Sequence, residues 1–568
     1  MNAKQIIENL EQMKSVRTSL DSELEECAAF ACPEKSDFSD SSFPYEKGKK
    51  KTNIIIDEIS EANSILARGL FSNLSPPNTR WFMFEVKNDK LKKDMVVKDF
   101  FTTASAEIYS MLMNSNFAME VNEGFEDIGW AGMINLYVDE DYEKVFKFRN
   151  LHISEYFIRE NAEGKIDSVY REFPLTSRQA FEKFGNDNLN PKIIADAKSD
   201  SAERNSRKYT FIHAVEPNPL VQHDPETNKP LPNQKNRAFK SVYVCRETNS
   251  IIRESGYEYM PYNVARFEKK SNSIYGYSPA RRVLRSAKLM NAIWHDTLKA
   301  GQRIVTPNPI IDINAYKREN TNSAFYTTPG KAHYYDAMGG KPPEFQPQPN
   351  GIPFGLELFD RIQRRINAAY FVDMFKMLQM LSEQDKRERT AFEIRQLVSE
   401  KQSMIIPVVA RLLEEFFTPL LKKCFYIALK KNLFSIDVPF ELNGYDIDVS
   451  FVSPLALATK GVEVNNFFEI VQSLLPFVEI NPGILDYIDF DKATVKIIET
   501  AGVHPAFVRS EAEVSKMRKE RAQAQQQQMA QQQMMELGKS QDMNKRPEQG
   551  SVGELAMGAM GGLANAKQ

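Results

Sequence analysis

Tyr275-Gly-Tyr-Ser-Pro-Ala-Arg-Arg282 is the stretch where short β-type runs give way to long helical patterns. Ser278 is a good N-cap, and Pro279 suits the first helical position because its fixed φ is pre-organised for a helix. The sequence therefore predicts a helix from Pro279 to about Gln302, which carries basic residues beside apolar ones. A second helix is predicted from Leu356 to Leu381, after a module rich in Pro, Gly and Asn.

A longer helical pattern follows, from Ala391 to about Lys431. It begins with the capping box Thr390-Ala-Phe-Glu393, whose end side chains satisfy free backbone N–H groups. Pro407 and Pro419 lie inside the pattern, and we expect kinks there because proline lacks an N–H and crowds the preceding turn. The charged segment 382–390 is predicted as a break between two long helices.

The region before Tyr275 has mixed patterns. Residues 116–267 are predicted as short strands interrupted by one helix, which starts at the cap Thr176-Ser177. The polar segments 186–208 and 216–237 are predicted as loops. The helices expected further upstream are 3–29, 54–74 and 97–114, with a strand at 81–86. The strands expected within 116–267 are 132–138, 142–148, 156–160, 169–173, 211–215 and 241–246.

The C-terminal part is less regular. Strands are predicted within 440–451 and small helices at 462–475 and 491–501. A second capping box, Ser510-Glu-Ala-Glu513, opens a polar helix that runs into a glutamine-rich tract. Taken together, the patterns predict an α+β protein.

Composition narrows the class of protein. The 568 residues carry 73 Lys and Arg and 76 Asp and Glu, a net charge of −3, which excludes a wholly basic nucleic-acid coat and a wholly acidic disordered chain. Four cysteines in so long a chain argue against a disulfide scaffold and fit a reducing compartment. Signal-peptide and membrane-span patterns are absent, so we expect a soluble, intracellular protein without a membrane partner.

Sequence motifs of common enzymes are also absent. The chain has no phosphate-binding Gly-rich loop, no zinc-binding helix and no Cys-x-x-Cys pair. Gly276-Tyr-Ser-Pro-Ala280 lacks the second glycine of a nucleophile elbow. We therefore expect no catalytic residue, no metal site and no cofactor. A carboxylate-based active site needs no motif, so an intracellular enzyme with an unrecognised carboxylate site stays an alternative.

Five blocks of sequence occur in an order that is typical of one protein family. The blocks are Leu74-Ser-Pro-Pro-Asn-Thr-Arg-Trp-Phe82, Phe125-Glu-Asp-Ile-Gly-Trp-Ala-Gly-Met-Ile-Asn-Leu-Tyr137, Arg171-Glu-Phe-Pro-Leu-Thr176, Tyr259-Met-Pro-Tyr262 with Arg266, and Tyr275-Gly-Tyr-Ser-Pro-Ala280. They resemble the head-to-tail connector, or portal, family of short-tailed bacteriophages. Trp130, Phe267 and Tyr277 stand where the family pattern has a small residue, Trp and Arg.

The resemblance implies a portal-type fold. Such a fold has a mixed α/β wing, a two-helix stem, a small clip, a long kinked wing helix and a helical C-terminal crown or barrel. The implied parts are the wing (1–277), the first stem helix (278–302), the clip (303–354), the second stem helix (355–381), the channel loop (382–390), the long wing helix with a second wing part (391–504) and the crown (505–568).

The resemblance also implies a function. The implied function is that of a dodecameric ring at one capsid vertex, whose channel carries double-stranded DNA during packaging and ejection. Implied partners are the terminase packaging ATPase, the tail adaptor and tail proteins, and the major capsid and scaffolding proteins. The protein would lie in the virion after assembly in the host cytoplasm. A conduit must hold DNA weakly, because each phosphate contact strengthens binding, and a net charge of −3 suits that requirement.

Two sets of basic residues are candidate sites under this resemblance. Lys386, Arg387 and Arg389 of the channel loop would lie nearest the DNA backbone, although Glu383, Asp385 and Glu388 could neutralise them in a solvated turn. The stem helices carry the second set, which would form salt bridges between subunits or contact DNA. Its members are Arg281, Arg285, Arg361, Arg364 and Arg365.

One further alternative is a helical scaffold that forms oligomers through its glutamine-rich C-terminal helix and never meets DNA. A truncation after about residue 505 distinguishes the two hypotheses. A portal would still form rings, whereas such a scaffold would fall to monomers.

Overall fold

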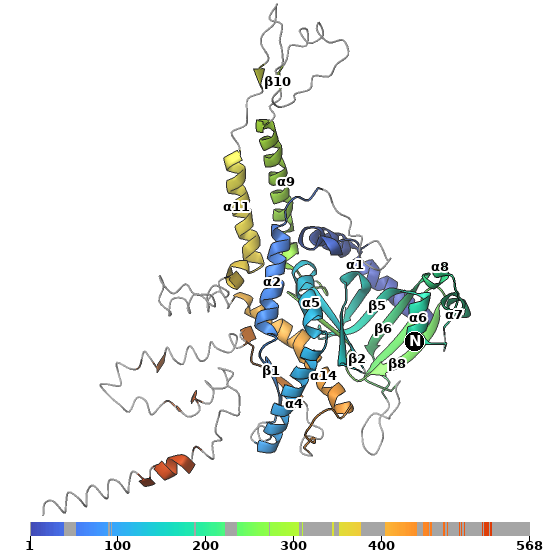
Figure 1. The fold of residues 1–568 in the computed structure, drawn as a ribbon, viewed down its shortest axis with the longest axis vertical. Coiled ribbons are helices and arrows are strands. Elements are labelled where there is room, and N and C mark those ends of the chain that lie inside the picture. Colours follow the sequence, from blue (N-terminus) through green and yellow to red (C-terminus); the bar gives the residue numbers. More distant parts are fainter. Residues whose placement is uncertain are drawn as a thin grey trace, which may run out of the picture. The chain divides into compact units, whose positions relative to one another are not determined.

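The computed structural model describes most of the chain as far as residue 456. The described residues are 2–38, 53–88, 91, 94–141, 143–186, 189–221, 236–271, 273–305, 309–310, 344–345, 352–376, 404–439, 447–453, 455–456 and isolated positions from 470 to 524. The chain divides into two units, Met1–Gly502 and Val503–Gln568. The first unit is mixed α+β, as predicted (Figure 1). In the second unit, residues 516–521 are helical, next to the predicted capping box.

The N-terminal helices follow the predictions with small shifts. They are α1 (Ala3–Ala31), α2 (Glu58–Leu74) and α4 (Met95–Asn114). Helix α1 ends just before Pro33, and strand β1 (Phe82–Val86) confirms the predicted strand.

The prediction of a single helix within residues 116–267 was wrong. Helix α5 (Phe117–Ala131) precedes the first strand of this region. Helices α7 (Pro191–Ala197) and α8 (Ala202–Asn205) lie in a segment predicted as loop. Helix α6 (Ser177–Phe184) is the predicted one, and Thr176 forms its capping box. In α5 the buried residues Phe117, Val121, Phe125 and Ile128 recur at helical spacing, so tertiary burial fits a helix there.

The largest sheet is antiparallel and five-stranded, in the order β4-β5-β6-β7-β8. Helix α1 packs on one face through Ile6, Leu10 and Met13, while α6 and α7 cover the other. Its strands are β4 (Tyr156–Glu160), β5 (Ile166–Thr176), β6 (Lys208–Pro217), β7 (Phe239–Cys245) and β8 (Ser250–Tyr257). A three-stranded sheet joins β3 (Val145–Asn150), β2 (Met133–Asp141) and β9 (Tyr262–Arg266). Strands β8 and β9 were not predicted.

An aromatic core in the first unit contains residues that are far apart in the sequence. Strand β1 pairs antiparallel with β12 (Ile447–Phe451), so Phe82 lies opposite Phe451. The fully buried Trp81 stacks on Phe117 and Phe451 and makes an edge contact with Phe417. Residues far apart in the sequence thereby share one core, which large aromatic side chains stabilise through their buried area.

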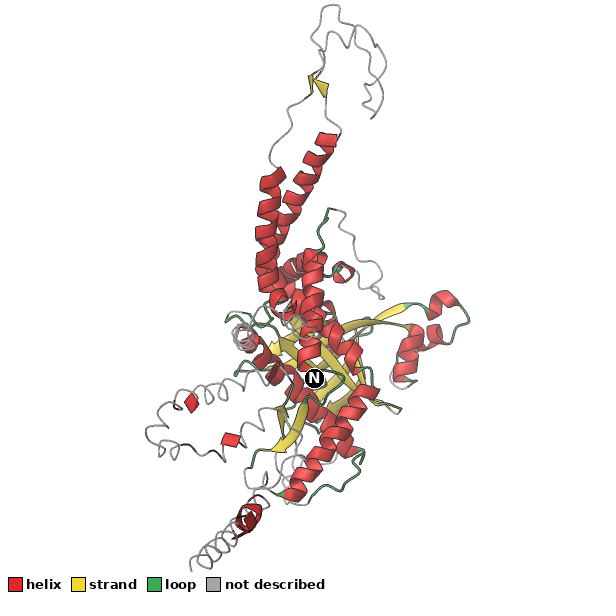
Figure 2. Ribbon diagram, turned by 60° about the vertical axis from the view of Figure 1, so that its left-hand side comes forward, coloured by secondary structure: helices red, strands yellow, loops and turns green. Residues whose placement is uncertain are grey.

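Two long helices, α9 (Pro279–Val305) and α11 (Ile352–Ala369), lie side by side (Figures 1 and 2). Beyond them β10 (Pro309–Ile310) pairs with β11 (Glu344–Phe345). The prediction that the second helix continues to Leu381 was wrong, because it ends at Ala369 and Phe371 takes a φ of 56°. The turn lets residues 372–376 pack on α2, where Gly69 leaves room for the Phe375 ring.

The long helical pattern is described from Met404 onward. Residues 404–412 are helical, a π-helical turn, η3 (Leu413–Phe417), follows, and α14 (Thr418–Lys430) completes the pattern. The π-turn ends just before Pro419, one of the two prolines where a kink was expected, whereas residues 404–412 are helical across Pro407. The predicted start at Thr390 lies outside the described residues, as do most of the small helices predicted at 462–475 and 491–501.

Candidate functional site at the base of the α9 and α11 pair

Two glycines bring distant sequence blocks into backbone contact at the start of α9. Gly132 ends α5 with a φ of 76°, and a Cβ on Gly276 would lie 2.0 Å from the Gly132 carbonyl oxygen. No side chain fits such an approach, which explains glycine at position 276. The block that contains Gly132 and the block that begins with Tyr275 are therefore in direct backbone contact.

The predicted start of α9 is confirmed. The Ser278 side-chain oxygen accepts a hydrogen bond from the backbone N–H of Arg281 at 3.1 Å, which is the N-cap contact. Ion pairs then fix the helix to its surroundings. Arg281 pairs with Glu23 of α1 at 2.8 Å, and Lys288 pairs with Glu26 at 2.6 Å. The guanidinium of Arg281 is therefore engaged within its own chain.

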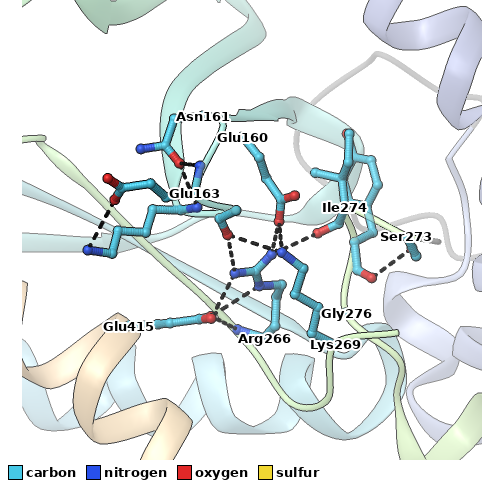
Figure 3. Close-up of polar contacts among 12 residues, drawn as sticks. Glu160, Asn161, Glu163, Arg266, Lys269, Ser273, Ile274, Gly276 and Glu415 are labelled. Carbon is cyan, nitrogen blue, oxygen red and sulfur yellow. Dashed lines mark hydrogen bonds and ion pairs between the residues drawn. The ribbon is translucent and has the colours of Figure 1, made fainter. Parts of the chain in front are cut away.

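A polar cluster lies beside this start, and we call its four charged members, Arg266, Lys269, Glu160 and Glu415, the Arg266 cluster (Figure 3). The Arg266 side chain is only 2% exposed and donates to Glu160 and, at 2.7 Å, to Glu415. Its guanidinium also donates to the carbonyl oxygens of Gly164 and Ile274. Lys269 donates to Glu160 at 2.7 Å.

The Arg266 cluster has two cations against two carboxylates, and Arg411 adds a further ion pair to Glu415 at 3.4 Å. Burial disfavours the charged guanidinium, but the hydrogen bonds and charges of Glu415 and Glu160 outweigh it and raise the pKa of Arg266. Arg266 therefore stays charged, and its partners stay fixed. A fully paired arrangement of this kind holds four segments together rather than presenting a reactive group.

The exposed surface of α9 and α11 has a different character. Arg285, Arg361, Arg364 and Arg365 are exposed and make no ion pair with another residue that the structure describes. Apolar side chains lie on the same two helices and are also open to solvent. Leu289, Leu298 and Leu356 are 49%, 42% and 45% exposed. An amphipathic pair with open leucines and unpaired arginines has the features of an interface.

The remaining predicted site residues, Lys386, Arg387 and Arg389, lie outside the described residues. The sequence did not point to three of the four residues of the Arg266 cluster, namely Lys269, Glu160 and Glu415. Glu160 and Glu415 lie 106 and 149 positions from Arg266, so no local pattern connects them. Arg266 itself belongs to one of the motif blocks, and that was the only signal in the sequence.

Among the residues that the structure describes, there is no cluster of three or more His, Cys, Asp or Glu side chains that could form a metal site. The same residues include no helix long and apolar enough to cross a membrane. A groove of about 790 Å³ lies between α1 and the five-stranded sheet. Ion pairs within the groove join Lys14 to Glu172 and Arg17 to Asp21.

Comparison with known proteins identifies the family to which the chain belongs. The family model described as "Bacteriophage head to tail connecting protein" matches residues 3–508. The chain is 28% identical over 488 residues to the "Probable portal protein" of Bordetella phage BPP-1, which covers 84% of each chain. It is 25% identical over 529 residues to the "Portal protein" of Salmonella phage epsilon15, with 92% of each chain covered. The chain therefore belongs to the family of bacteriophage head to tail connecting proteins.

Proposed function

We propose that the chain is a phage portal, a dodecameric ring at one capsid vertex through which double-stranded DNA is packaged and later ejected. The α9 and α11 pair is the stem, and the module between the helices is the clip. The protein has a structural role, with no catalytic site or cofactor of its own. It lies in the virion after assembly in the host cytoplasm.

The observation that carries this proposal is the half-open apolar surface of the stem. In the first half of α9, Val283, Ala287 and Met290 are buried against the rest of the unit. From Asn291 to Val305 no side chain that the structure describes is buried. The contact between α9 and α11 leaves Leu289, Leu298 and Leu356 exposed, and solvent exposure of leucines costs free energy. Neighbouring copies of the stem in a ring supply the missing cover.

The unpaired stem arginines fit the same arrangement. A guanidinium recognises carboxylates on an adjoining surface with two parallel hydrogen bonds, which gives orientation as well as attraction. Asp360 and Glu357 are exposed on the same helix as Arg361 and can serve as acceptors for a neighbouring copy. We assign Arg285, Arg361, Arg364 and Arg365 to contacts between subunits, with DNA contact as the alternative.

The channel would be lined by residues that keep DNA from sticking. Lys386, Arg387 and Arg389 of the proposed channel loop are assigned to the DNA backbone because the sequence places three cations within four positions. Their acidic neighbours limit the net charge, and weak, non-specific contact lets a duplex move.

Other components of the virus would act on this ring. The clip, residues 303–354, would dock the terminase packaging ATPase and afterwards the tail adaptor. ATP hydrolysis belongs to that partner. The wing would meet the major capsid and scaffolding proteins during assembly.

The test is a charge reversal on the stem. Arg361→Glu with Arg365→Glu should abolish rings in native mass spectrometry and leave a folded monomer, because like charges then face the acidic groups of the neighbouring subunit. The matched control is Lys192→Glu with Arg204→Glu, which reverses two exposed charges on α7 and α8 and should leave rings intact. Intact rings with faulty DNA packaging would move the stem arginines to the DNA channel. Intact rings with normal packaging would overturn the assignment.

A further inference from the structure

The π-turn η3 interrupts the long helix at a defined place. The backbone N–H of Thr418 reaches the carbonyl oxygen of Leu413, five residues earlier, and the Thr418 hydroxyl donates to the same oxygen at 2.7 Å. Pro419 follows directly and has no N–H to continue an α-helical ladder to Glu415. Single π-turns are rare in helices, and those that occur often lie at functional sites.

Glu415, inside this turn, makes three hydrogen bonds to one residue. Its two carboxylate oxygens accept from the backbone N–H of Arg266 at 3.1 Å, from Nε at 3.1 Å and from Nη2 at 2.7 Å. Arg266 is the last residue of β9, an edge strand that pairs only with β2 in its three-stranded sheet. The Glu415 carboxylate binds the backbone N–H of Arg266 at the unpaired edge of β9. The side chain of Glu415 thus fixes the π-turn to both backbone and guanidinium.

The same guanidinium contacts the segment that leads into α9. Its Nη1 donates to the Ile274 carbonyl oxygen at 3.4 Å, and Ser273 donates from its hydroxyl to the Tyr275 carbonyl oxygen at 2.8 Å (Figure 3). Residues 273–278 form the turn that ends in the N-cap of α9. One buried side chain is therefore shared by the π-turn of the long helix and by the base of the stem.

The core leaves the π-turn little freedom of register. Leu412, Phe416, Phe417 and Leu420 are all fully buried, although Phe416 and Phe417 are neighbours in the sequence. Loss of the extra residue of a π-turn would rotate the preceding helix by about 100° relative to α14. Ile405 and the other buried residues of 404–412 would then leave the core.

We propose that the Arg266–Glu415 pair mechanically couples the base of the stem to the long helix through this π-turn. The coupling runs through the hydrogen bonds of Arg266, which join it to η3 at Glu415 and to residues 273–278 at the Ile274 carbonyl oxygen. It goes beyond the proposed portal function and does not depend on ring formation, since every contact lies within one chain.

Amide hydrogen exchange of the full-length chain, kept monomeric by dilution, tests the coupling. Thr418→Val removes the hydroxyl bond at the far side of the π-turn and keeps the side-chain shape. Exchange should become about ten-fold faster in residues 413–418 and, by coupling, also faster in residues 273–278. The control is Thr102→Val in α4, which removes a similar bond to the Lys98 carbonyl oxygen and should change neither segment.

Substitution of the coupling residue itself gives the second arm. Glu415→Gln keeps the shape but weakens the charge-assisted bonds, so both segments should exchange faster together, whereas Glu414→Gln on the exposed side of the same turn should change neither. Faster exchange in residues 413–418 alone, with residues 273–278 unchanged in both Thr418→Val and Glu415→Gln, would overturn the proposal. Unchanged exchange in both segments would overturn it equally.

Discussion

Arg266 and Arg361 carry the same charge in opposite settings. Arg266 is 2% exposed and lies between two carboxylates of its own chain. Arg361 is exposed on α11 and has no ion-pair partner within the described residues. The base of the stem therefore satisfies its charges internally, while the stem surface leaves both arginines and leucines open.

This contrast separates what the chain stabilises alone from what it offers to a partner. A buried charge must be paired before the unit is stable, so the Arg266 cluster belongs to the folding of one subunit. Exposed side chains without an ion-pair partner add little to the stability of a single chain. They contribute to the free energy of association when a second surface covers them. Substitutions in the two regions should accordingly affect different measurements.

The largest effect is expected at the glycine contact. Gly276→Ala should lower the free energy of unfolding by about 4 kcal/mol, because the new Cβ would meet the Gly132 carbonyl oxygen at 2.0 Å. Gly301→Ala in α9, where nothing lies within 4 Å, should raise it by about 0.5–1 kcal/mol through helix propensity. Urea unfolding followed by circular dichroism compares the two. Equal effects would contradict the close backbone approach.

The second-largest effect on stability is expected from the loss of the buried arginine. Arg266→Met should destabilise the chain by about 3 kcal/mol, because Glu160 and Glu415 are left without their main partner. Arg361→Met should change the stability of the monomer by less than about 0.5 kcal/mol. Differential scanning calorimetry at low protein concentration measures both. A similar loss for both variants would remove the distinction between the two regions.

A smaller effect, with a pH dependence, is expected at Lys423 of α14. This side chain is 6% exposed and donates to the Val138 carbonyl oxygen at 3.0 Å, and burial lowers its pKa to about 7. The folded chain then binds fewer protons than the unfolded chain from about pH 7 up to the ordinary lysine pKa, so stability should rise with pH over that window.

Lys423→Met should remove this slope and add about 1 kcal/mol at pH 7, since the gain from removing a buried charge exceeds the lost hydrogen bond. Melting temperatures at pH 7 and pH 9 measure the slope in both proteins. Equal slopes in the wild type and the variant would show that Lys423 is not the titrating group.

The smallest effect on a single chain is expected at the open leucines. Leu289→Ser with Leu298→Ser should change the melting temperature of the monomer by no more than about 2 °C, because both side chains are nearly half exposed. The same variant should no longer form rings in size-exclusion chromatography with light scattering. Rings that survive this change would show that the stem leucines are not covered by a neighbour.

Sequence patterns predicted the helices that have clear caps and periods. Thr176 and Ser278 are N-caps where expected, and the boundaries of α1 and α9 differ from the predictions by only a few residues. Local signals failed where burial decides the structure. Phe371 turns the chain with a φ of 56°, although the apolar stripe of α11 continues past it in the sequence.

The candidate site was only partly predictable. Arg266, Gly276 and Ser278 were marked by motif blocks, but the roles of Glu160 and Glu415 depend on contacts across more than 100 positions. The predicted arginines of the stem divide into Arg281, which pairs with Glu23, and four that have no ion-pair partner within the described residues. Sequence spacing shows which face of a helix a charge occupies but not which distant segment covers that face.

The mass and symmetry of the purified full-length protein test the portal proposal most directly. Native mass spectrometry, with class averages from negative-stain electron microscopy, should show a closed ring with a central hole and near twelve-fold symmetry. The open leucines and arginines of the stem would then be covered by neighbouring copies. A stable closed dimer or tetramer would contradict the account.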